Sequence, residues 1–183
     1  MRTVLLLTIL GLGGVAGAWA QKTRVEVVKP TTPEDDARPN NPEVPEGIAL
    51  SAEFERIVIF RFKFQTDLLA GIEKLLRQEK IRSAVILSGV GSVRNYHIHS
   101  VSNRDFLSKN IYTKDPTQPA DIVSVNGFVM DGRVHAHVTM ADTEKAFGGH
   151  LEPEAHVFTF AIVTLGVLPD HLDLRWLDDK TRR

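Results

Sequence analysis

Cysteine is absent from the 183-residue sequence. No disulfide bond can therefore stabilise the fold, and there is no cysteine to carry a lipid anchor. The stability of the folded protein must come from a packed hydrophobic core, from a bound metal or from the association of several chains.

An excess of positive charge is also lacking, because 22 Lys and Arg stand against 23 Asp and Glu, which gives a net charge of −1. Proteins that bind nucleic acids usually display a basic patch or stripe. The basic cluster here is the short KTRR at residues 180–183, so the composition argues against a nucleic-acid partner.

Motifs of several enzyme classes are missing as well. The sequence has no G-x-S-x-G elbow, no H-E-x-x-H pair and no Walker-type loop. The stretch GVGSVR, residues 89–94, begins like a dinucleotide-binding loop, but Arg94 takes the place of the third glycine. Since a strand rather than a helix is expected next, we predict a tight turn at a strand end.

The first twenty residues have the features of a signal peptide. Arg2 supplies a positive charge, residues 4–12 form an apolar run, and Ala18-Trp19-Ala20 matches a signal peptidase site. The run is too short for a permanent membrane span. We therefore predict export, to the periplasm or outside the cell, with cleavage before Gln21; an uncleaved N-terminal anchor is the alternative.

Four segments are predicted along the chain: a signal peptide at 1–20, a linker at 21–47, a folded domain at 48–178 and a basic tail at 179–183. The linker contains five of the nine prolines, between Pro30 and Pro45. It cannot bury enough apolar surface to offset the entropy of ordering, so we predict disorder. An irregular arm packed on a neighbouring subunit is the alternative.

The folded domain is predicted to be α+β, with a mainly antiparallel sheet and one or two helices. Apolar periodicity predicts a helix at 66–80, capped by Thr66 or Asp67. Asp131-Gly132 predicts a tight hairpin turn. Residues 103–120 are expected to form a long loop or irregular hairpin, and 141–149 a turn-rich connection. Strands are predicted at 56–64, 83–93, 94–102, 121–130, 133–141, 156–168 and 171–177.

Three histidines suggest a metal site. His135 and His137 alternate with apolar residues in a predicted strand, so both imidazoles lie on one face and can bind one ion. His150 follows Gly148-Gly149 and returns beside them if the chain turns back. Three histidines leave a coordination position open, and Glu152 could be a fourth ligand or a hydrogen-bond acceptor. The alternative is ordinary strand histidines without an ion.

His97 and His99 repeat the same spacing in the predicted strand at 94–102. This second pair could face the first across the sheet or line an interface between subunits. Taken alone, it is more typical of exposed strand histidines.

Two stretches resemble the PPC (plants and prokaryotes conserved) domain: GIEKLLRQEKIRSAVILSGVGSVRN at 71–95, and DIVSVNGFVMDGRVHAHVTMADTEKAFGGHLEPEAHVFTFAIVTLGVL at 121–168. The resemblance covers about residues 55–168. It implies an antiparallel α+β fold, assembly as a homotrimer, and a divalent metal, with zinc expected, bound by His135, His137 and His150.

The resemblance leaves several functions open. Plant members carry AT-hooks and bind AT-rich DNA, and prokaryotic members are often labelled as DNA-binding for that reason. This chain has no R-G-R-P hook, so we disfavour that function. We expect an exported, trimeric metal-binding protein able to hold a small ligand at its metal. The alternative is a metal-dependent hydrolase or decarboxylase, since the fold is similar to that of acetolactate decarboxylase, with Glu152, Glu154 or His97 as acid or base.

Overall fold

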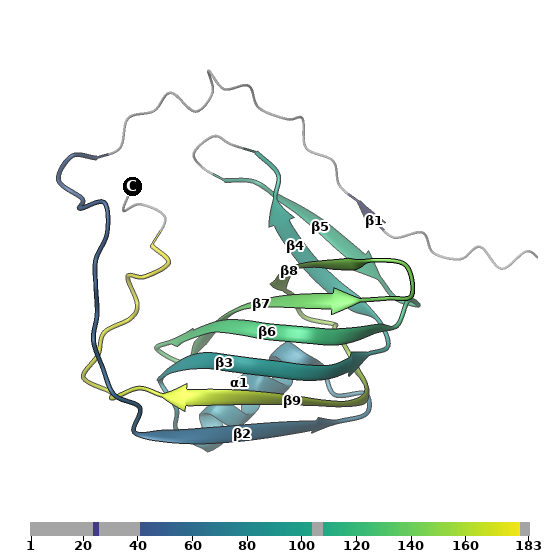
Figure 1. The fold of residues 1–183 in the computed structure, drawn as a ribbon, viewed down its shortest axis with the longest axis horizontal. Helices are drawn as coiled ribbons and strands as arrows, with labels where there is room; N and C mark the ends of the chain where they lie inside the picture. Colours follow the sequence, from purple (N-terminus) through teal and green to yellow (C-terminus); the bar gives the residue numbers. More distant parts are fainter. Residues whose placement is uncertain (1–23, 26–40, 104–107, 180–183) are drawn as a thin grey trace, which may run out of the picture.

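A computed structural model describes residues 24–25, 41–103 and 108–179 of the chain (Figure 1). The predicted signal peptide at 1–20 lies outside the described residues, as do most of the predicted linker and the end of the predicted basic tail.

The described residues form one helix and one antiparallel sheet of nine strands, ordered β1-β5-β4-β8-β7-β6-β3-β9-β2. This confirms the predicted α+β class. The elements are β1 (Arg24–Val25), β2 (Arg56–Lys63), α1 (Leu68–Gln78), β3 (Ser83–Val93), β4 (Tyr96–Val101), β5 (Asn110–Asp115), β6 (Ala120–Met130), β7 (Arg133–Ala141), β8 (Ala146–Leu151) and β9 (Val157–Val167).

The helix begins and packs as its sequence predicts. The Asp67 side chain caps it, because Oδ1 accepts a hydrogen bond from the backbone N–H of Ala70 at 3.0 Å. Leu68, Ile72 and Leu76 are buried along one face of the helix, which lies against the sheet. Figure 1 shows α1 behind the central strands.

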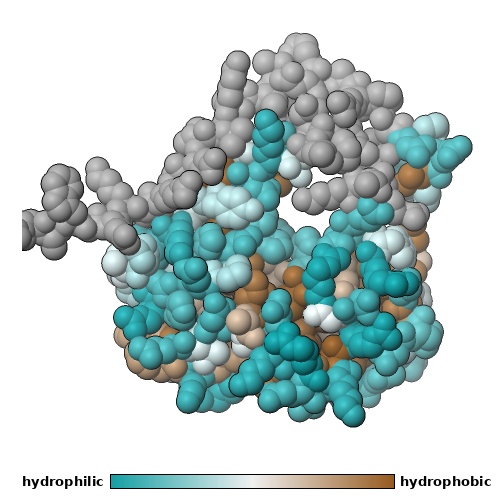
Figure 2. Space-filling model, turned by 180° about the vertical axis from the view of Figure 1, so that it is seen from behind, coloured by the Kyte–Doolittle hydropathy of each residue, from teal (hydrophilic) through white to brown (hydrophobic). Residues whose placement is uncertain are grey.

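The two faces of the sheet differ in what covers them. Alternate strand residues such as Phe60, Phe62 and Ala136 are buried with the helix in the hydrophobic core. Their neighbours lie on the opposite side, called the open face below. Figure 2, which views the molecule from behind, shows a mostly hydrophilic surface on the side of α1. No helix within the described residues is long and apolar enough to cross a membrane.

The predicted turn at Asp131-Gly132 is confirmed. Both residues have positive φ angles, 53° and 79°, and they join β6 to β7 in register. This is the backbone twist that a two-residue hairpin requires, and asparagine, aspartate and glycine adopt it most readily.

Of the two predictions for residues 103–120, the irregular hairpin is the one that fits: residues 110–115 form strand β5, whose backbone pairs antiparallel with β4 along its whole length although its side chains do not alternate. Three other local predictions were wrong. Gly89 and Gly91, predicted to form a turn at a strand end, lie inside β3. Strand β8 begins at Ala146, so Gly148 and Gly149 lie inside a strand and not in a connection. Residues 171–177 form turns instead of a strand: the Asp173 side chain accepts a hydrogen bond from the backbone N–H of Arg175 at 3.0 Å.

Candidate metal centre

Four histidines lie side by side on the open face of the sheet. On β7, His135 and His137 alternate with the buried residues Val134, Ala136 and Val138. His137 is the register partner of His150 on β8, and His150 is the register partner of His99 on β4. Residues directly opposite one another in antiparallel strands project to the same side of the sheet. The register therefore brings histidine side chains from three neighbouring strands, β4, β8 and β7, together on one face.

The ring positions show how close the predicted ligands are. The ring centroid of His150 lies 5.0 Å from that of His135 and 5.4 Å from that of His137, and these two rings are 5.5 Å apart. The ring of His99 stacks on that of His150 at 4.5 Å. The three histidines singled out in the sequence are therefore brought together, and His99 joins them. We call these four residues the histidine cluster.

Three histidines of the cluster have the Nδ1 atom beside an oxygen acceptor. His135 Nδ1 lies 3.3 Å from Asp178 Oδ2, and His150 Nδ1 lies 3.1 Å from the carbonyl oxygen of Leu151. His99 Nδ1 forms a short hydrogen bond with the carboxylate of Glu152. With the proton on Nδ1, each of these rings presents Nε2 as a free lone pair, which is the form in which imidazole binds a metal.

Glu152 contacts the histidine cluster, and its position bears on both roles predicted for it, metal ligand and hydrogen-bond acceptor. Its Oε1 is 3.7 Å from Nδ1 of His150 as well as close to Nδ1 of His99, which suits a hydrogen-bond acceptor. His99, His150 and Glu152 also offer three ligand atoms within 4.8 Å of one another, a set that could itself hold an ion. His150 is common to this set and to the three predicted ligands.

Electrostatics favour neutral rings at the centre of the cluster. Burial lowers the pKa of His150, and the nearby imidazoles of His99 and His135 lower it further. Burial also lowers the pKa of His137, with smaller contributions from His135 and His99. A histidine must be neutral to bind a metal, so this environment fits the donor set for a divalent cation such as zinc.

The other acid–base candidates lie at the edge of the cluster. His97 shares the face of His99, and its Nδ1 lies 2.9 Å from the carbonyl oxygen of Pro153. Glu154 forms an ion pair with Lys114 on β5; the hydrogen bond from Lys114, together with its positive charge, lowers the pKa of the Glu154 carboxyl group. Of the three candidates, Glu152 is the one in contact with the cluster.

Two neighbours of the cluster were missed by reasoning from the sequence. Tyr112 on β5 is the register partner of His99, with ring centroids 5.3 Å apart. It was missed because the prediction of a long loop or irregular hairpin at 103–120 gave no register with the strand of His99. Asp178, which contacts His135, is 43 positions further along the chain; no spacing rule connects residues that far apart.

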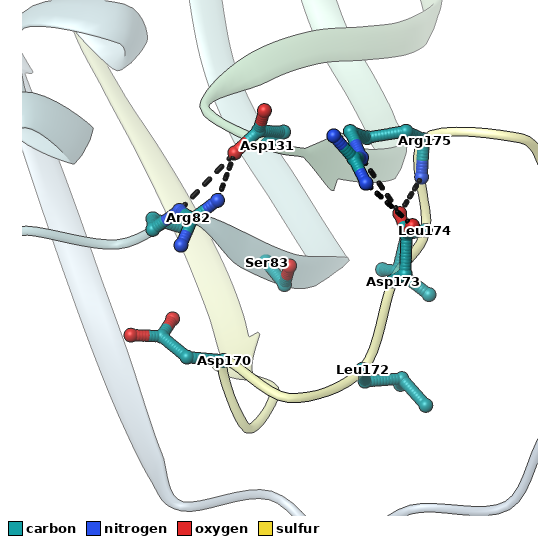
Figure 3. Close-up of a pocket in the computed structure, with 8 residues that line it drawn as sticks. All are labelled: Arg82, Ser83, Asp131, Asp170, Leu172, Asp173, Leu174 and Arg175. Atoms are coloured by element: carbon teal, nitrogen blue, oxygen red, sulfur yellow. Dashed lines mark hydrogen bonds and ion pairs between the residues drawn. The ribbon is translucent and has the colours of Figure 1, made fainter.

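A shallow pocket lies at the β6–β7 turn, where ion pairs line it (Figure 3). Arg82 donates to Asp131 through Nε at 3.1 Å, and Arg175 donates to Asp173 through Nη2 at 2.8 Å. Each of these two ion pairs lies within one part of the pocket, the first between the start of β3 and the turn and the second inside the C-terminal segment, so these charged groups already have partners of their own.

Comparison with known proteins places the fold among relatives. The family model of the Plants and Prokaryotes Conserved domain matches residues 49–169. A bifunctional protein GlmU from Synechococcus sp. (strain JA-2-3B'a(2-13)) is 28% identical over 118 residues, 63% of this chain. The match spans only 17% of that protein, and a second GlmU is covered to 16%.

Solved structures of proteins in the same family are similar to this chain. A metal-containing protein from Archaeoglobus fulgidus is 26% identical, with a TM-score of 0.56 over 66% of this chain and 86% of that one. A plant- and prokaryote-conserved protein from Pyrococcus horikoshii is 28% identical, with a TM-score of 0.53 over 67% and 85%. A candidate DNA-binding protein from Ralstonia eutropha shares the fold at 23% identity and TM-score 0.50, over 63% and 80%. The chain thus belongs to the Plants and Prokaryotes Conserved domain family.

Proposed function

We propose that this chain is an exported, homotrimeric protein that holds a divalent metal, zinc, through His135, His137 and His150, and that binds a small ligand at the open coordination position. The observation that carries the proposal is the register of β7 with β8, which sets His137 opposite His150 beside His135. The likeness to a protein described as metal-containing, at 26% identity, supports it.

The donor set agrees with this role. Neutral imidazoles with the proton on Nδ1 bind zinc through Nε2, at about 2.0–2.1 Å. Zinc bound by three histidines keeps a fourth position for water or another ligand, and polarises whatever occupies it. On this chain, Glu152 beside His99 and His150 would orient their rings.

Titration with zinc tests the proposal. The protein is freed of metal with a chelator and titrated by calorimetry, alongside His135→Ala, His137→Ala and His150→Ala. We expect one zinc per chain for the wild type and a loss of affinity of at least 100-fold for each variant. His171→Ala is the matched control, since His171 is exposed and outside the cluster. Wild-type protein that binds no zinc, or variants that bind as well as the control, would contradict it.

Export rests on the sequence of residues 1–20, and its test is direct. The full chain is produced in a Gram-negative bacterium, the cells are fractionated, and the N-terminus of the product is sequenced. We expect the protein in the periplasm or medium, starting at Gln21. A cytoplasmic product that retains Met1 would contradict export.

The proposed homotrimer accounts for the apolar character of the open face. Five large apolar side chains of this face are between 39 and 66% exposed: Ile57, Ile59, Val90, Phe128 and Phe160. Exposed apolar side chains gathered on one face usually mark an interaction surface, whereas the opposite side of the sheet is mostly hydrophilic (Figure 2). Light scattering should give three times the mass of one chain, and a monomeric mass would contradict the trimer.

A metal-dependent enzyme is the second candidate, favoured by the carboxylate of Glu152 at the cluster. A hydrolase would release 4-nitrophenol from an activated ester at a rate that depends on zinc and falls in Glu152→Gln. A zinc-binding protein without hydrolytic activity would show the background rate in both. We propose no nucleic-acid partner; binding to AT-rich DNA that weakens steeply with salt would overturn that statement.

A further inference from the structure

The C-terminal segment, residues 168–179, follows β9 and is almost wholly outside the residues 49–169 that match the family. Leu168 and Leu174 are buried with Met130 in a small hydrophobic cluster at the end of β6. Figure 1 shows the yellow segment leaving the end of β9 and passing along the left-hand ends of the central strands. The hydrophobic cluster thus anchors the segment and brings Asp178 to strand β7.

Asp178 makes polar contacts with two side chains of β7. Arg133 donates from Nη2 to Oδ1 at 2.8 Å and from Nη1 to Oδ2, so its guanidinium forms a bidentate ion pair with the carboxylate. His135 Nδ1 lies 3.3 Å from Oδ2. The Asp178 side chain is 20% exposed, and a bidentate pair with arginine fixes the plane of a carboxylate.

We propose that Asp178 is a positioning residue of the metal centre, which accepts the Nδ1 proton of His135 and so holds Nε2 of that ring toward the ion. This inference rests on the proposed metal-binding function. A carboxylate behind a ligating histidine fixes its tautomer and ring orientation and makes it a better ligand. Arg133 prevents the carboxylate from rotating away, and thus acts on His135 through Asp178.

The origin of this acceptor sets it apart from the others in the cluster. His150 has the carbonyl of its neighbour Leu151, and His99 has Glu152 at the end of β8. Both acceptors belong to the part of the chain that the family model matches. The Nδ1 acceptor of His135 instead lies in a segment past the matched range, so residues outside the family match support one of the predicted ligands.

The first test measures zinc affinity in competition with a chromophoric chelator. Asp178→Asn replaces the charged carboxylate with a neutral amide, whose NH2 group can donate to Nδ1 and favour the other tautomer of His135. It should bind zinc 10- to 100-fold more weakly than the wild type, the usual effect of losing a carboxylate partner behind a ligating histidine. Asp173→Asn is the matched control, because Asp173 lies in the same segment and pairs with Arg175, away from the histidines. It should bind zinc as the wild type does. Affinity of Asp178→Asn within twofold of this control would overturn the proposal.

A second test reads the tautomer of His135 directly in the metal-free wild type, by ¹⁵N NMR at about pH 8, where imidazole is neutral. The His135 signal is identified by its disappearance in His135→Asn. We expect protonated Nδ1 and bare Nε2, and a shift toward the other tautomer in Asp178→Asn. Wild-type His135 with its proton on Nε2 would overturn the proposal, whether or not the variant folds.

The two tests separate this inference from the proposed function. If the wild type binds no zinc, the metal-binding function fails, while the tautomer of His135 still decides whether Asp178 positions the ring. If the wild type binds zinc and Asp178→Asn binds it equally well, the metal site stands and the positioning role fails.

Discussion

Gly149 lies in β8 next to His150, at the point where β8 pairs with β4. A Cβ atom at this position would lie 2.4 Å from the carbonyl oxygen of His99 and 3.1 Å from the Ser100 hydroxyl oxygen. Carbon and oxygen atoms of neighbouring strands ordinarily stay about 3.3–3.6 Å apart. Replacement by alanine therefore requires a shift of about 1 Å between β4 and β8.

This shift would act on stability and on the site together. Forcing a methyl group into a closely packed region costs about 1–3 kcal/mol, so Gly149→Ala should lower the melting temperature by several degrees. Because the atom in the way belongs to His99, whose ring stacks on His150, the same shift separates these two rings. Since β8 also carries His150, one of the proposed ligands, its displacement should lower zinc affinity as well as stability.

The assay is thermal unfolding with and without zinc, together with a zinc titration. Gly47→Ala is the control, since a Cβ at Gly47 would meet nothing within 4 Å; it should change neither quantity. If Gly149→Ala is as stable as the Gly47 variant and binds zinc as well as the wild type, the argument from strand spacing is refuted.

Three further predictions concern pH, the helix cap and assembly. Since the pKa values of His137 and His150 are lowered in the folded chain, the unfolded chain takes up protons first as the pH falls. The free energy of unfolding of the metal-free protein should thus be level above about pH 6.5 and decrease below it. Replacing both histidines by Asn should flatten the decrease; an unchanged pH profile in this double variant would contradict the assignment of the decrease to His137 and His150. Asp67→Ala removes acceptors for the N–H groups of Ala70 and Glu154 and should cost about 1–3 kcal/mol in urea unfolding; Asp67→Asn, which keeps the capping oxygen, should cost less, and equal losses would argue against the cap. Ile59→Asp places a charge on the exposed apolar face and should reduce the mass in light scattering to that of a monomer; a mass equal to that of the wild type would exclude this surface from the interface.

Local signals in the sequence were sufficient for much of the fold. The helix has a capping aspartate and one apolar face, and both features are determined by residues within one or two turns. The β6–β7 hairpin follows from the backbone preferences of Asp131 and Gly132. The alternation of His135 and His137 with buried residues likewise follows from strand geometry alone.

Features that depend on pairing between distant segments could not be predicted in this way. Strand β5 lacks an alternating pattern, because hydrogen bonds to β4 rather than burial of one face hold it in place. One of the two interpretations of the second histidine pair placed it facing the first, but the register of His99 with His150, which brings His99 into the cluster, is not revealed by local spacing. Asp178 reaches His135 only because a hydrophobic cluster near Met130 folds the C-terminal segment back.

The central claim is that three histidines of this cluster bind one metal ion. X-ray absorption spectroscopy of the zinc-loaded protein tests it most directly, because imidazole ligands produce a characteristic multiple-scattering pattern. The account predicts one zinc per chain with three imidazole nitrogens at about 2.0–2.1 Å, and the loss of one imidazole in His137→Ala. A zinc ion coordinated by oxygen atoms with at most one imidazole, or a spectrum unchanged by that substitution, would contradict it.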